Sequence, residues 1–271
     1  MAIIPSVLLN FLFPPPPSLF ITTMSVIGFS SLTNAGFKEI KGKHMQYSKF
    51  MNVGVAQKKN DGMKLLSSRN GMLFFYTPAF LIGLTSFFLF ADQDLRFVLL
   101  SLALTLHFLK RVLEVLFVHK FSGSMTLESA IIVSLSYAFS TATMIYAQYL
   151  SRDIHEPVVD LKYIGIGVFL VGITGNFYHH RILANLRKEG EKDYKIPQGG
   201  LFELVICPHY LFEIFGYVGI SCIAQTTYAF AFTLGTIFYL TGRSCATREW
   251  YISKFGDNFP KDVKAFIPYI L

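Results

Sequence analysis

Titratable side chains gather in an apolar stretch at residues 196–217. Pro208 precedes His209 and Tyr210, and Glu213 follows one helical turn later, so these side chains can share one face of a helix. A tyrosine hydroxyl beside a cation can donate a hydrogen bond or a proton to a developing oxyanion. It can equally be a buried hydroxyl that needs only a partner, and the spacing alone leaves both interpretations open.

A second polar stripe interrupts the apolar segment at residues 97–118. His107 lies about one turn before Lys110 and Arg111, and both cations are spaced to pair with Glu114. Charges inside a membrane helix cost free energy unless they are paired or used, so they mark a functional site by default. We expect this stripe to line a cavity that holds an anionic or carbonyl group. The alternative is an internal ion pair, with Lys110 reaching toward the headgroups.

Composition places these groups in a membrane protein. Hydrophobic residues make up 52% of the 271 positions and charged residues only 15%, and the mean hydropathy is +0.46. A soluble domain carries about 25% charged residues. The net charge of +7 is first a signal of membrane topology, and no nucleic-acid partner is expected. The three cysteines lack CxxC spacing, and His179-His180 has no further ligand at metal-binding spacing, so no disulfide framework or metal is expected.

Seven segments approach the roughly 20 apolar residues that a helix needs to cross a bilayer. The loops after the first, third, fifth and seventh segments hold most of the Lys and Arg, which places those loops on the cytosolic side. The sequence therefore predicts an all-α integral membrane protein, a single domain of residues 1–271 with about seven transmembrane helices and a cytosolic carboxyl terminus. The predicted segments are 18–34, 71–91, 97–118, 127–150, 161–178, 204–224 and 227–242.

The basic loop at residues 179–200 follows the fifth segment and includes Lys188 and Lys192. Its Tyr, His and Arg residues suit either a membrane–water interface or a phosphate site, and the residues alone do not separate the two. No GxGxxG or Walker A motif occurs in the chain. A nucleotide would therefore be bound without a Rossmann fold.

Several motifs recur in order along residues 165–271. They are Gly175-Asn176, Leu186-Arg187, Tyr194-Lys-Ile-Pro-Gln-Gly-Gly-Leu-Phe-Glu203, Cys207-Pro-x-Tyr210-x-x-Glu213, Trp250-Tyr251-x-x-Lys-Phe255 and Lys264-Ala-Phe-Ile-Pro-Tyr269. In this order they resemble the carboxyl-terminal half of the steroid 5α-reductase family, whose members are seven-helix membrane enzymes that use NADPH to reduce a carbon–carbon double bond. The resemblance implies a substrate-side half at residues 1–160 and an NADPH-binding half at residues 161–271. It implies these cofactor contacts: Asn176, Arg187, Tyr194, Lys195, His209, Glu213, Arg248 and Tyr251.

The amino-terminal half departs from the steroid enzymes. Those carry Gln-Glu shortly before a proline in the second span and a Tyr beside the His of the third, whereas this chain has Phe75-Tyr76-Thr-Pro78 and His107-Phe108. The run from His107 to Gly123 instead resembles the very-long-chain trans-2-enoyl-CoA reductase branch, which implies Lys110 and Tyr210 as the catalytic pair. His209 replaces the Asn of that branch and is similar to the polyprenol-reductase branch.

These resemblances imply NADPH-dependent reduction of a double bond conjugated to a carbonyl in a lipid, with a trans-2-enoyl-CoA favoured. Tyr210 and Lys110 are the expected catalytic residues, Tyr76 is the reserve acid, and His107, Arg111 and Glu114 are expected to bind substrate. Three alternatives remain: a 3-oxo-Δ4-steroid 5α-reductase in which Tyr76 replaces the missing carboxylate, a polyprenol reductase, and a non-catalytic lipid-binding membrane protein. The expected location is the endoplasmic reticulum membrane, with membrane enzymes as further candidate partners.

Overall fold

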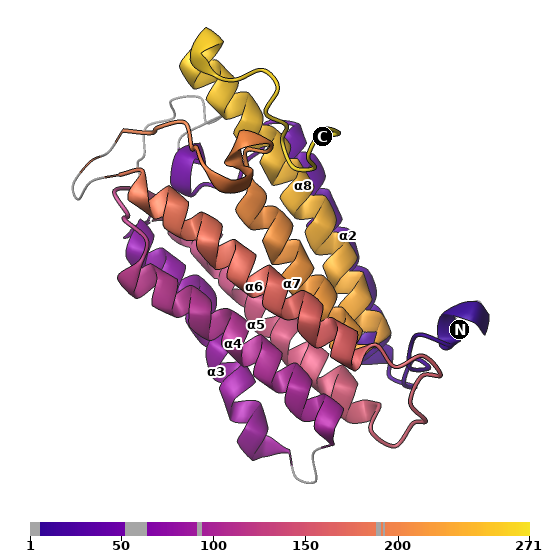
Figure 1. The fold of residues 1–271 in the computed structure, drawn as a ribbon. Helices are drawn as coiled ribbons and strands as arrows, with labels where there is room; N and C mark the ends of the chain where they lie inside the picture. The colour runs from indigo at the N-terminus through magenta and orange to yellow at the C-terminus, as the bar shows by residue number, and fades with distance from the viewer. Residues whose placement is uncertain (1–5, 52–63, 91–93, 188–190, 192) are drawn as a thin grey trace.

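The computed structural model describes residues 6–51, 64–90, 94–187, 191 and 193–271. Long helices dominate this part of the chain and run side by side as one bundle (Figure 1). They alternate in direction, so that α2, α4, α6 and α8 all end at the face drawn uppermost in Figure 1, called the upper end below. The long helices are α2 (Leu19–Ile40), α3 (Ser68–Leu89), α4 (Leu95–Phe117), α5 (Leu127–Leu150), α6 (Lys162–Asn185), α7 (Pro208–Ala224) and α8 (Thr227–Phe255).

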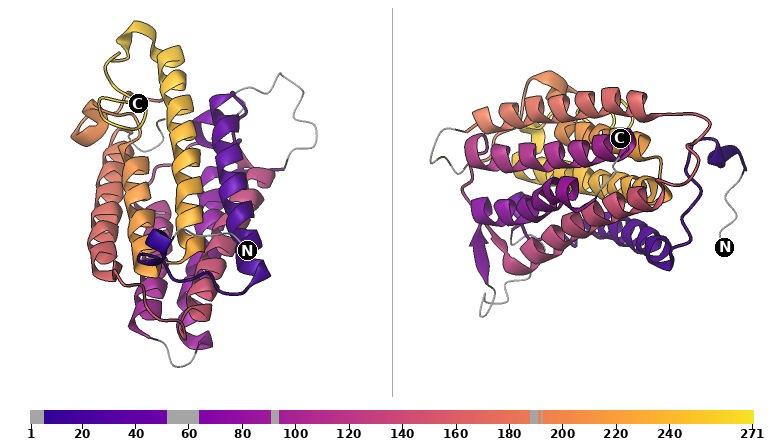
Figure 2. Two further views of the ribbon diagram at one scale, coloured as in Figure 1. Left: turned by 90° about the vertical axis from the view of Figure 1, so that its right-hand side faces the viewer. Right: turned by 90° about the horizontal axis from the view of Figure 1, so that it is seen from below.

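Short elements lie between the long helices. A two-stranded antiparallel sheet pairs β1 (Leu65–Ser67) with β2 (Ser124–Thr126), which ties the start of α3 to the start of α5. The amino terminus carries α1 (Ser6–Leu9) at the lower end, opposite the carboxyl terminus (Figure 2). The 3₁₀ turns are η1 (Ser48–Phe50), η2 (Gly200–Glu203) and η3 (Gly256–Asn258).

Polar residues begin the helices where the sequence supplies them. The side chains of Ser18, Ser67, Asp94 and Thr126 accept hydrogen bonds from backbone N–H groups in the first turns of α2, α3, α4 and α5. Such caps satisfy donors that have no partner inside the helix. Helix α7 ends at Gln225, whose φ of 50° breaks the helical backbone and lets α8 turn back along it.

The predicted segments match the long helices in number and order, but three of their upper ends were placed too early. Helix α2 continues to Ile40, α6 to Asn185 and α8 to Phe255, beyond the predicted limits of 34, 178 and 242. The apolar pattern stops there, but the helical backbone continues, because polar residues such as Lys, Arg and Glu favour a helix about as well as Leu does. Helix α7 begins later than predicted, at Pro208, because a proline at the first helical position lacks only an N–H that would be unpaired anyway.

The outer surface of the bundle is apolar. Large hydrophobic side chains such as Phe88, Leu89 and Phe117 are mostly exposed, which is typical of a lipid-facing exterior. By length and apolar composition alone, two described helices, α3 and α5, could each cross a membrane. The apolar sequence of α4 is interrupted by charged residues. Helix α7 has 17 residues, which is short for a helix that crosses a bilayer. The chain is therefore a mostly helical protein whose surface favours membrane association.

Glycines let α6 and α7 approach each other closely. A Cβ added at Gly172 would overlap the backbone of Gly216, and one added at Gly165 would lie 2.7 Å from the carbonyl oxygen of Gly219. Small residues at such positions allow helix backbones to pack tightly in membranes. Helices α2 and α8 use the same device where Gly242 meets the backbone of Gly36.

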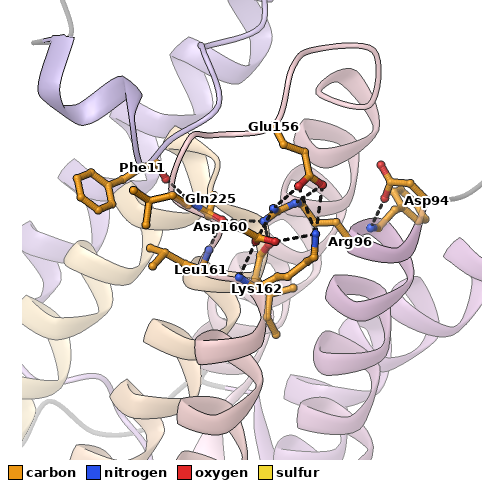
Figure 3. Close-up of polar contacts among 11 residues, drawn as sticks. Phe11, Asp94, Arg96, Glu156, Asp160, Leu161, Lys162 and Gln225 are labelled. Atoms are coloured by element: carbon orange, nitrogen blue, oxygen red, sulfur yellow. Dashed lines mark hydrogen bonds and ion pairs between the residues drawn. The ribbon is translucent and has the colours of Figure 1, made fainter.

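A buried arginine holds the lower end together (Figure 3). Arg96 is 1% exposed and donates to Asp160 at 2.8 Å, to Gln225 at 2.9 Å and to the carbonyl oxygen of Ile223 at 2.8 Å. It also pairs with Glu156 at 3.2 Å, and its hydrogen bond lowers the pKa of that carboxyl. The contacts join α4 to the loop before α6 and to the turn between α7 and α8, so they fix the end of the bundle remote from the site described next.

Candidate active site

A cavity of about 320 Å³ opens at the upper end and reaches the middle of the bundle. All seven long helices contribute to its wall, together with residues 45–50. Its volume is near the lower limit for small-molecule sites, about 300–1,000 Å³. Its wall is mainly apolar, and the polar residues that line it are Tyr47, Ser48, Lys49, Tyr76, Arg111, His119, Ser136, Tyr137, His180, His209, Tyr210, Glu213, Thr236, Tyr239, Arg243 and Thr247.

Arg111 is the centre of a buried polar network on one wall. Its Nη1 donates to Glu114 at 2.6 Å and lies 2.9 Å from Nδ1 of His180. Its Nη2 donates to the hydroxyl of Tyr76 at 2.7 Å. Glu114 also pairs with Lys110 at 3.1 Å, so both ion pairs expected from the helical spacing are present. Each partner compensates for the cost of burying the other.

Lys110 does not line the cavity. Its ammonium donates to Oδ1 of the buried Asn176, and the amide nitrogen of Asn176 in turn donates to the carbonyl oxygen of His209 at 2.7 Å and to Glu213 at 3.5 Å. Lys110 and Asn176 thus support the start of α7 from behind. These contacts join Lys110 to Asn176 and not to Tyr210. The expectation that Lys110 acts together with Tyr210 therefore stays a prediction.

The start of α7 presents its polar residues to the cavity. His209, Tyr210 and Glu213 all line it, as their spacing indicated. The ring of His209 lies 4.3 Å from that of Tyr210, and its Nδ1 is buried without a hydrogen-bond partner among the described residues. A buried polar atom of this kind costs free energy unless a ligand or water satisfies it. His107, by contrast, is buried against Tyr217 with ring centroids 5.0 Å apart and lies outside the lining.

Cations and aromatic rings form a chain of contacts that begins at Lys49 in the cavity wall and continues through Trp250 to Tyr194. Arg187 lies 4.3 Å above the ring of Tyr194, and Lys254 lies 5.3 Å from the ring of Trp250. Lys49 lies 4.9 Å from the ring of the buried Tyr251. Within the described ranges none of the three cations pairs with a carboxylate, so their charge is available to an anion. We call Lys49, Arg187, Tyr194, Trp250, Tyr251 and Lys254 the mouth cluster.

Two expected cofactor residues have structural partners instead. Arg248 donates to the carbonyl oxygens of Val263 and Lys261, at 2.8 and 3.1 Å, and so holds the carboxyl-terminal tail against α8. Lys195 pairs with Glu191 at 2.7 Å, and its carbonyl oxygen accepts from Tyr251. The basic residues Lys188 and Lys192 lie outside the described residues.

Sequence reasoning missed the buried ion pair that positions Lys49 at the cavity. Glu39 of α2 and Arg243 of α8 form an ion pair at 2.7 Å, and both are 1% exposed. The guanidinium of Arg243 lies between the rings of Tyr47 and Phe50, at 4.3 and 4.0 Å. These contacts hold residues 47–50 beside the cavity. Charge in an apolar helix was the available signal, but ending the last segment at residue 242 assigned Arg243 to a tail.

Glu114, His119 and His180 lie close enough together to resemble a metal site. The guanidinium of Arg111 already contacts Glu114 and His180, and Lys110 also pairs with Glu114. Burial, with the charge of Arg111 second, lowers the pKa of His119 to about 4. The positive charges of Arg111 and Lys110 would repel a metal ion at these groups. We therefore interpret the arrangement as an ion-pair network among the described residues.

Comparison with known proteins shows the family of the chain. Residues 126–271, more than half of the chain, match the family model described as 3-oxo-5-alpha-steroid 4-dehydrogenase. The chain belongs to this family. The matched part contains α5 to α8, and therefore the wall around α7 and most of the mouth cluster.

Curated relatives of both expected branches are similar to the chain. A very-long-chain enoyl-CoA reductase of Dictyostelium discoideum is 33% identical over 62% of this chain and 56% of its own length. The steroid 5-alpha-reductase DET2 of Gossypium hirsutum is 45% identical over 39% of this chain and 41% of its own. The 3-oxo-5-alpha-steroid 4-dehydrogenase 1 of Homo sapiens is 36% identical over 46% of this chain and 48% of its own length. The chain thus spans about half the length of these relatives.

Proposed function

We propose that the protein is an NADPH-dependent membrane reductase that saturates a carbon–carbon double bond conjugated to a carbonyl in a lipid, with a trans-2-enoyl-CoA as the favoured substrate. One observation carries the proposal: a single cavity is lined by Lys49, which adjoins the rings of Trp250 and Tyr251, by the tyrosines Tyr76 and Tyr210, and by apolar side chains. A polar dinucleotide and an apolar chain could each occupy the part that suits it and meet at Tyr76 and Tyr210.

The mouth cluster fits a phosphorylated dinucleotide. Lys49, Arg187 and Lys254 can pair with phosphate oxygens, and Tyr194 or Trp250 can stack on a base. The partnerless Nδ1 of His209, deeper in the cavity, could bond a carboxamide. NADPH, when bound, supplies a hydride. The chain's own residues bind and orient it, and Lys110 and Asn176 support α7 from behind.

An apolar part of the cavity wall fits an acyl chain. Leu32 and Ala35 of α2 and Ile132 of α5 line it, and Ile132 is also 50% exposed on the outer surface. Helix α2 packs along α8, whereas α5 packs along α3. The boundary between α2 and α5 is therefore the side through which a lipid would enter from the bilayer.

The same proposal places seven spans in the endoplasmic reticulum membrane with the mouth and the carboxyl terminus in the cytosol. The upper end carries the basic loops, while Asp94, Asp153, Glu156 and Asp160 lie at the lower end. Basic loops favour the cytosolic side, where NADPH and acyl-CoA are dissolved. The division into a substrate-side half, 1–160, and a cofactor half, 161–271, stays a prediction, since residues 45–50 also reach the mouth.

A steroid is the second candidate substrate. The Gossypium relative is named a steroid 5-alpha-reductase, and Tyr76 has a cationic partner that could help it bind a 3-oxo group. Polyprenol reduction and a non-catalytic lipid-binding role are the remaining alternatives.

The decisive experiment measures dinucleotide binding and oxidation by the purified full chain in lipid nanodiscs. Trp250 is the only tryptophan and belongs to the mouth cluster, so quenching of its fluorescence reports binding directly. We expect NADPH to quench it, and trans-2-hexadecenoyl-CoA to drive NADPH oxidation faster than a 3-oxo-Δ4-steroid or a polyprenol substrate. Neither quenching nor oxidation with any of them would leave a non-catalytic membrane protein.

A further inference from the structure

We propose that Tyr76 donates the hydrogen bond that binds the substrate carbonyl and its developing oxyanion, and that Arg111 is the positioning residue that aims this hydroxyl. This assignment deepens the proposed function and rests on it. It chooses between Tyr76 and Tyr210, both of which line the cavity. The spacing of residues along the chain could not distinguish them.

The direction of the Tyr76 hydrogen follows from the chemistry of its partner. A guanidinium N–H can only donate, so the Tyr76 oxygen is the acceptor in its 2.7 Å contact with Nη2 of Arg111. A tyrosine hydroxyl has one hydrogen, which must then point elsewhere. In the described part of the chain this hydroxyl has no second hydrogen-bond partner, and both residues line the cavity. The hydrogen is available to an acceptor inside it.

Arg111 cannot easily turn away from Tyr76. Its other terminal nitrogen is held by Glu114 at 2.6 Å and by His180 at 2.9 Å. Its Cζ also lies 4.7 Å from the centre of the Tyr76 ring. Contacts from two helices therefore fix the cation, and its charge lies directly behind the hydroxyl that would bear part of the negative charge.

The backbone around Tyr76 is fixed as well. Pro78 has no N–H, so the carbonyl oxygen of Phe74 loses its partner inside α3. The hydroxyl of Ser134 on α5 donates to that oxygen at 2.7 Å. The ring of Tyr76 packs 5.7 Å from that of Tyr137, also on α5. A donor that is held in place before the reaction stabilises an oxyanion without reorganisation.

Tyr210 lacks such support. Its hydroxyl has no hydrogen-bond partner among the described residues, and its ring contacts His209 at 4.3 Å. No hydrogen bond from a described residue therefore sets the direction of its O–H. Its position on α7, beside His209 and nearer the mouth-side residues Tyr47 and Arg243, suits contact with the cofactor instead.

The reaction balances with these roles. The β-carbon gains a hydride from the reduced nicotinamide, and the π electron pair of the double bond moves so that negative charge develops on the carbonyl oxygen. Tyr76 donates its hydrogen bond to that oxygen, with Arg111 behind it. The α-carbon then takes a proton from water, which gives the saturated carbonyl compound and a dinucleotide oxidised by two electrons.

The test compares purified wild type with Tyr76→Phe, Tyr210→Phe, Arg111→Lys and the double variant Tyr76→Phe/Arg111→Lys. Tyr146→Phe is the matched control, because it removes a hydroxyl on α5 outside the cavity lining. We expect Tyr76→Phe to lower kcat by about 10²–10³-fold, the usual loss for one oxyanion donor, while Trp250 quenching by NADPH keeps its wild-type midpoint. Tyr210→Phe should instead shift that midpoint.

Two further readouts separate positioning from general damage. If Arg111 acts through Tyr76, Arg111→Lys should add little to the loss in the Tyr76→Phe background, since residues that act as a unit are not additive. The carbonyl stretch of a bound, ¹³C-labelled trans-2-hexadecenoyl-CoA should lie at lower frequency in wild type than in Tyr76→Phe, and between the two in Arg111→Lys. Circular dichroism and thermal midpoints check that each variant folds.

Three results would overturn the assignment: near-wild-type kcat in Tyr76→Phe, independent losses in the double variant, or a carbonyl shift that disappears only in Tyr210→Phe. Each of them requires an active wild type. If wild type itself neither binds nor oxidises NADPH with any lipid offered, the proposed function has failed instead.

Discussion

Buried charges in this bundle divide into those that have a partner and those that do not. Arg111, Arg96 and Arg243 each contact a carboxylate at 2.8 Å or less. Each of them therefore stabilises the fold through an ion pair. Lys49 lines the cavity, contacts the rings of Trp250 and Tyr251, and pairs with no carboxylate among the described residues. An ammonium in that position needs an anion to offset its partial burial. This difference identifies Lys49 as the residue to test for cofactor binding.

The affinity for NADPH should fall as the pH rises through about 8. Burial lowers the pKa of Lys49 from 10.5 to about 8, so the side chain is a cation below that pH and neutral above it. A neutral amine pairs poorly with phosphate, and losing one charge-assisted bond weakens binding by about tenfold. The effect is measured by titrating Trp250 fluorescence with NADPH at pH values from about 6.5 to about 9.5, which bracket this pKa.

Lys49→Arg should retain tight binding across this range, because arginine stays charged. Lys49→Ala should bind weakly at every pH, while Lys43→Ala, on the same loop but exposed, should behave as wild type. A pH dependence that survives in Lys49→Ala would assign it to another group.

Glu39→Gln should destabilise the fold strongly. It leaves the 1% exposed Arg243 without its carboxylate, and breaking a buried ion pair from one side costs about 3–5 kcal/mol. Thermal unfolding in detergent measures the loss. Asp257→Asn removes one member of the fully exposed Lys261–Asp257 pair and should leave the midpoint within error. Equal effects of the two substitutions would show that the buried pair contributes no more than a surface pair.

At the scale of elements, the close approach of α6 and α7 positions the chemistry. The glycines of this contact bring Asn176 on α6 within hydrogen-bond distance of the start of α7. The two helices share the most extensive contact in the bundle. A small outward movement of α6 would therefore separate Asn176 from the carbonyl oxygen of His209 to which it donates.

Gly172→Ala should lower both stability and turnover. The added methyl group would overlap the backbone of Gly216, and overpacking of this kind typically costs about 1–3 kcal/mol. Thermal midpoints and NADPH oxidation measure the two effects. Gly167→Ala on the same helix meets nothing within 4 Å and should be neutral or slightly stabilising, because alanine favours helix over glycine. A harmless Gly172→Ala would mean that α6 and α7 can move apart without consequence.

At the scale of the molecule, the two ends of the bundle differ in charge and in purpose. The upper end holds the cavity mouth and the basic loops, whereas the lower end is closed by the network around Arg96. An enzyme that takes a soluble cofactor from one side of a membrane needs such asymmetry. On the proposed function, we expect the mouth to face the cytosol and Arg96 to face the lumen.

Glycosylation can test that orientation in sealed microsomes. An Asn-Gly-Thr tag inserted at Asp153, an exposed residue of the lower end, should be glycosylated because the acceptor would face the lumen. The same tag at Asp257, exposed at the upper end, should stay unmodified, and a shift in gel mobility reads both. The opposite pattern would invert the topology and place the mouth away from the cytosolic cofactor.

The sequence by itself determined the number and order of the long helices among the described residues, because hydropathy and spacing are local properties of a chain. The catalytic and cofactor residues that its motifs indicate stay a prediction. The sequence placed the upper ends of α2, α6 and α8 too early, since polar residues also favour a helix and the helix continues past its apolar stretch. Arg243 is the example: a residue that looked like part of a tail is buried against Glu39.

Only the tertiary structure decided which of those residues face one another. Along α4, Lys110 and Arg111 are neighbours with the same charge, yet Lys110 contacts Asn176 behind the cavity and Arg111 contacts Tyr76 within its wall. Lys49 reaches the mouth because Glu39 and Arg243 hold the preceding loop. Such contacts depend on how helices distant in sequence rotate and pack against each other, which no local pattern of residues encodes.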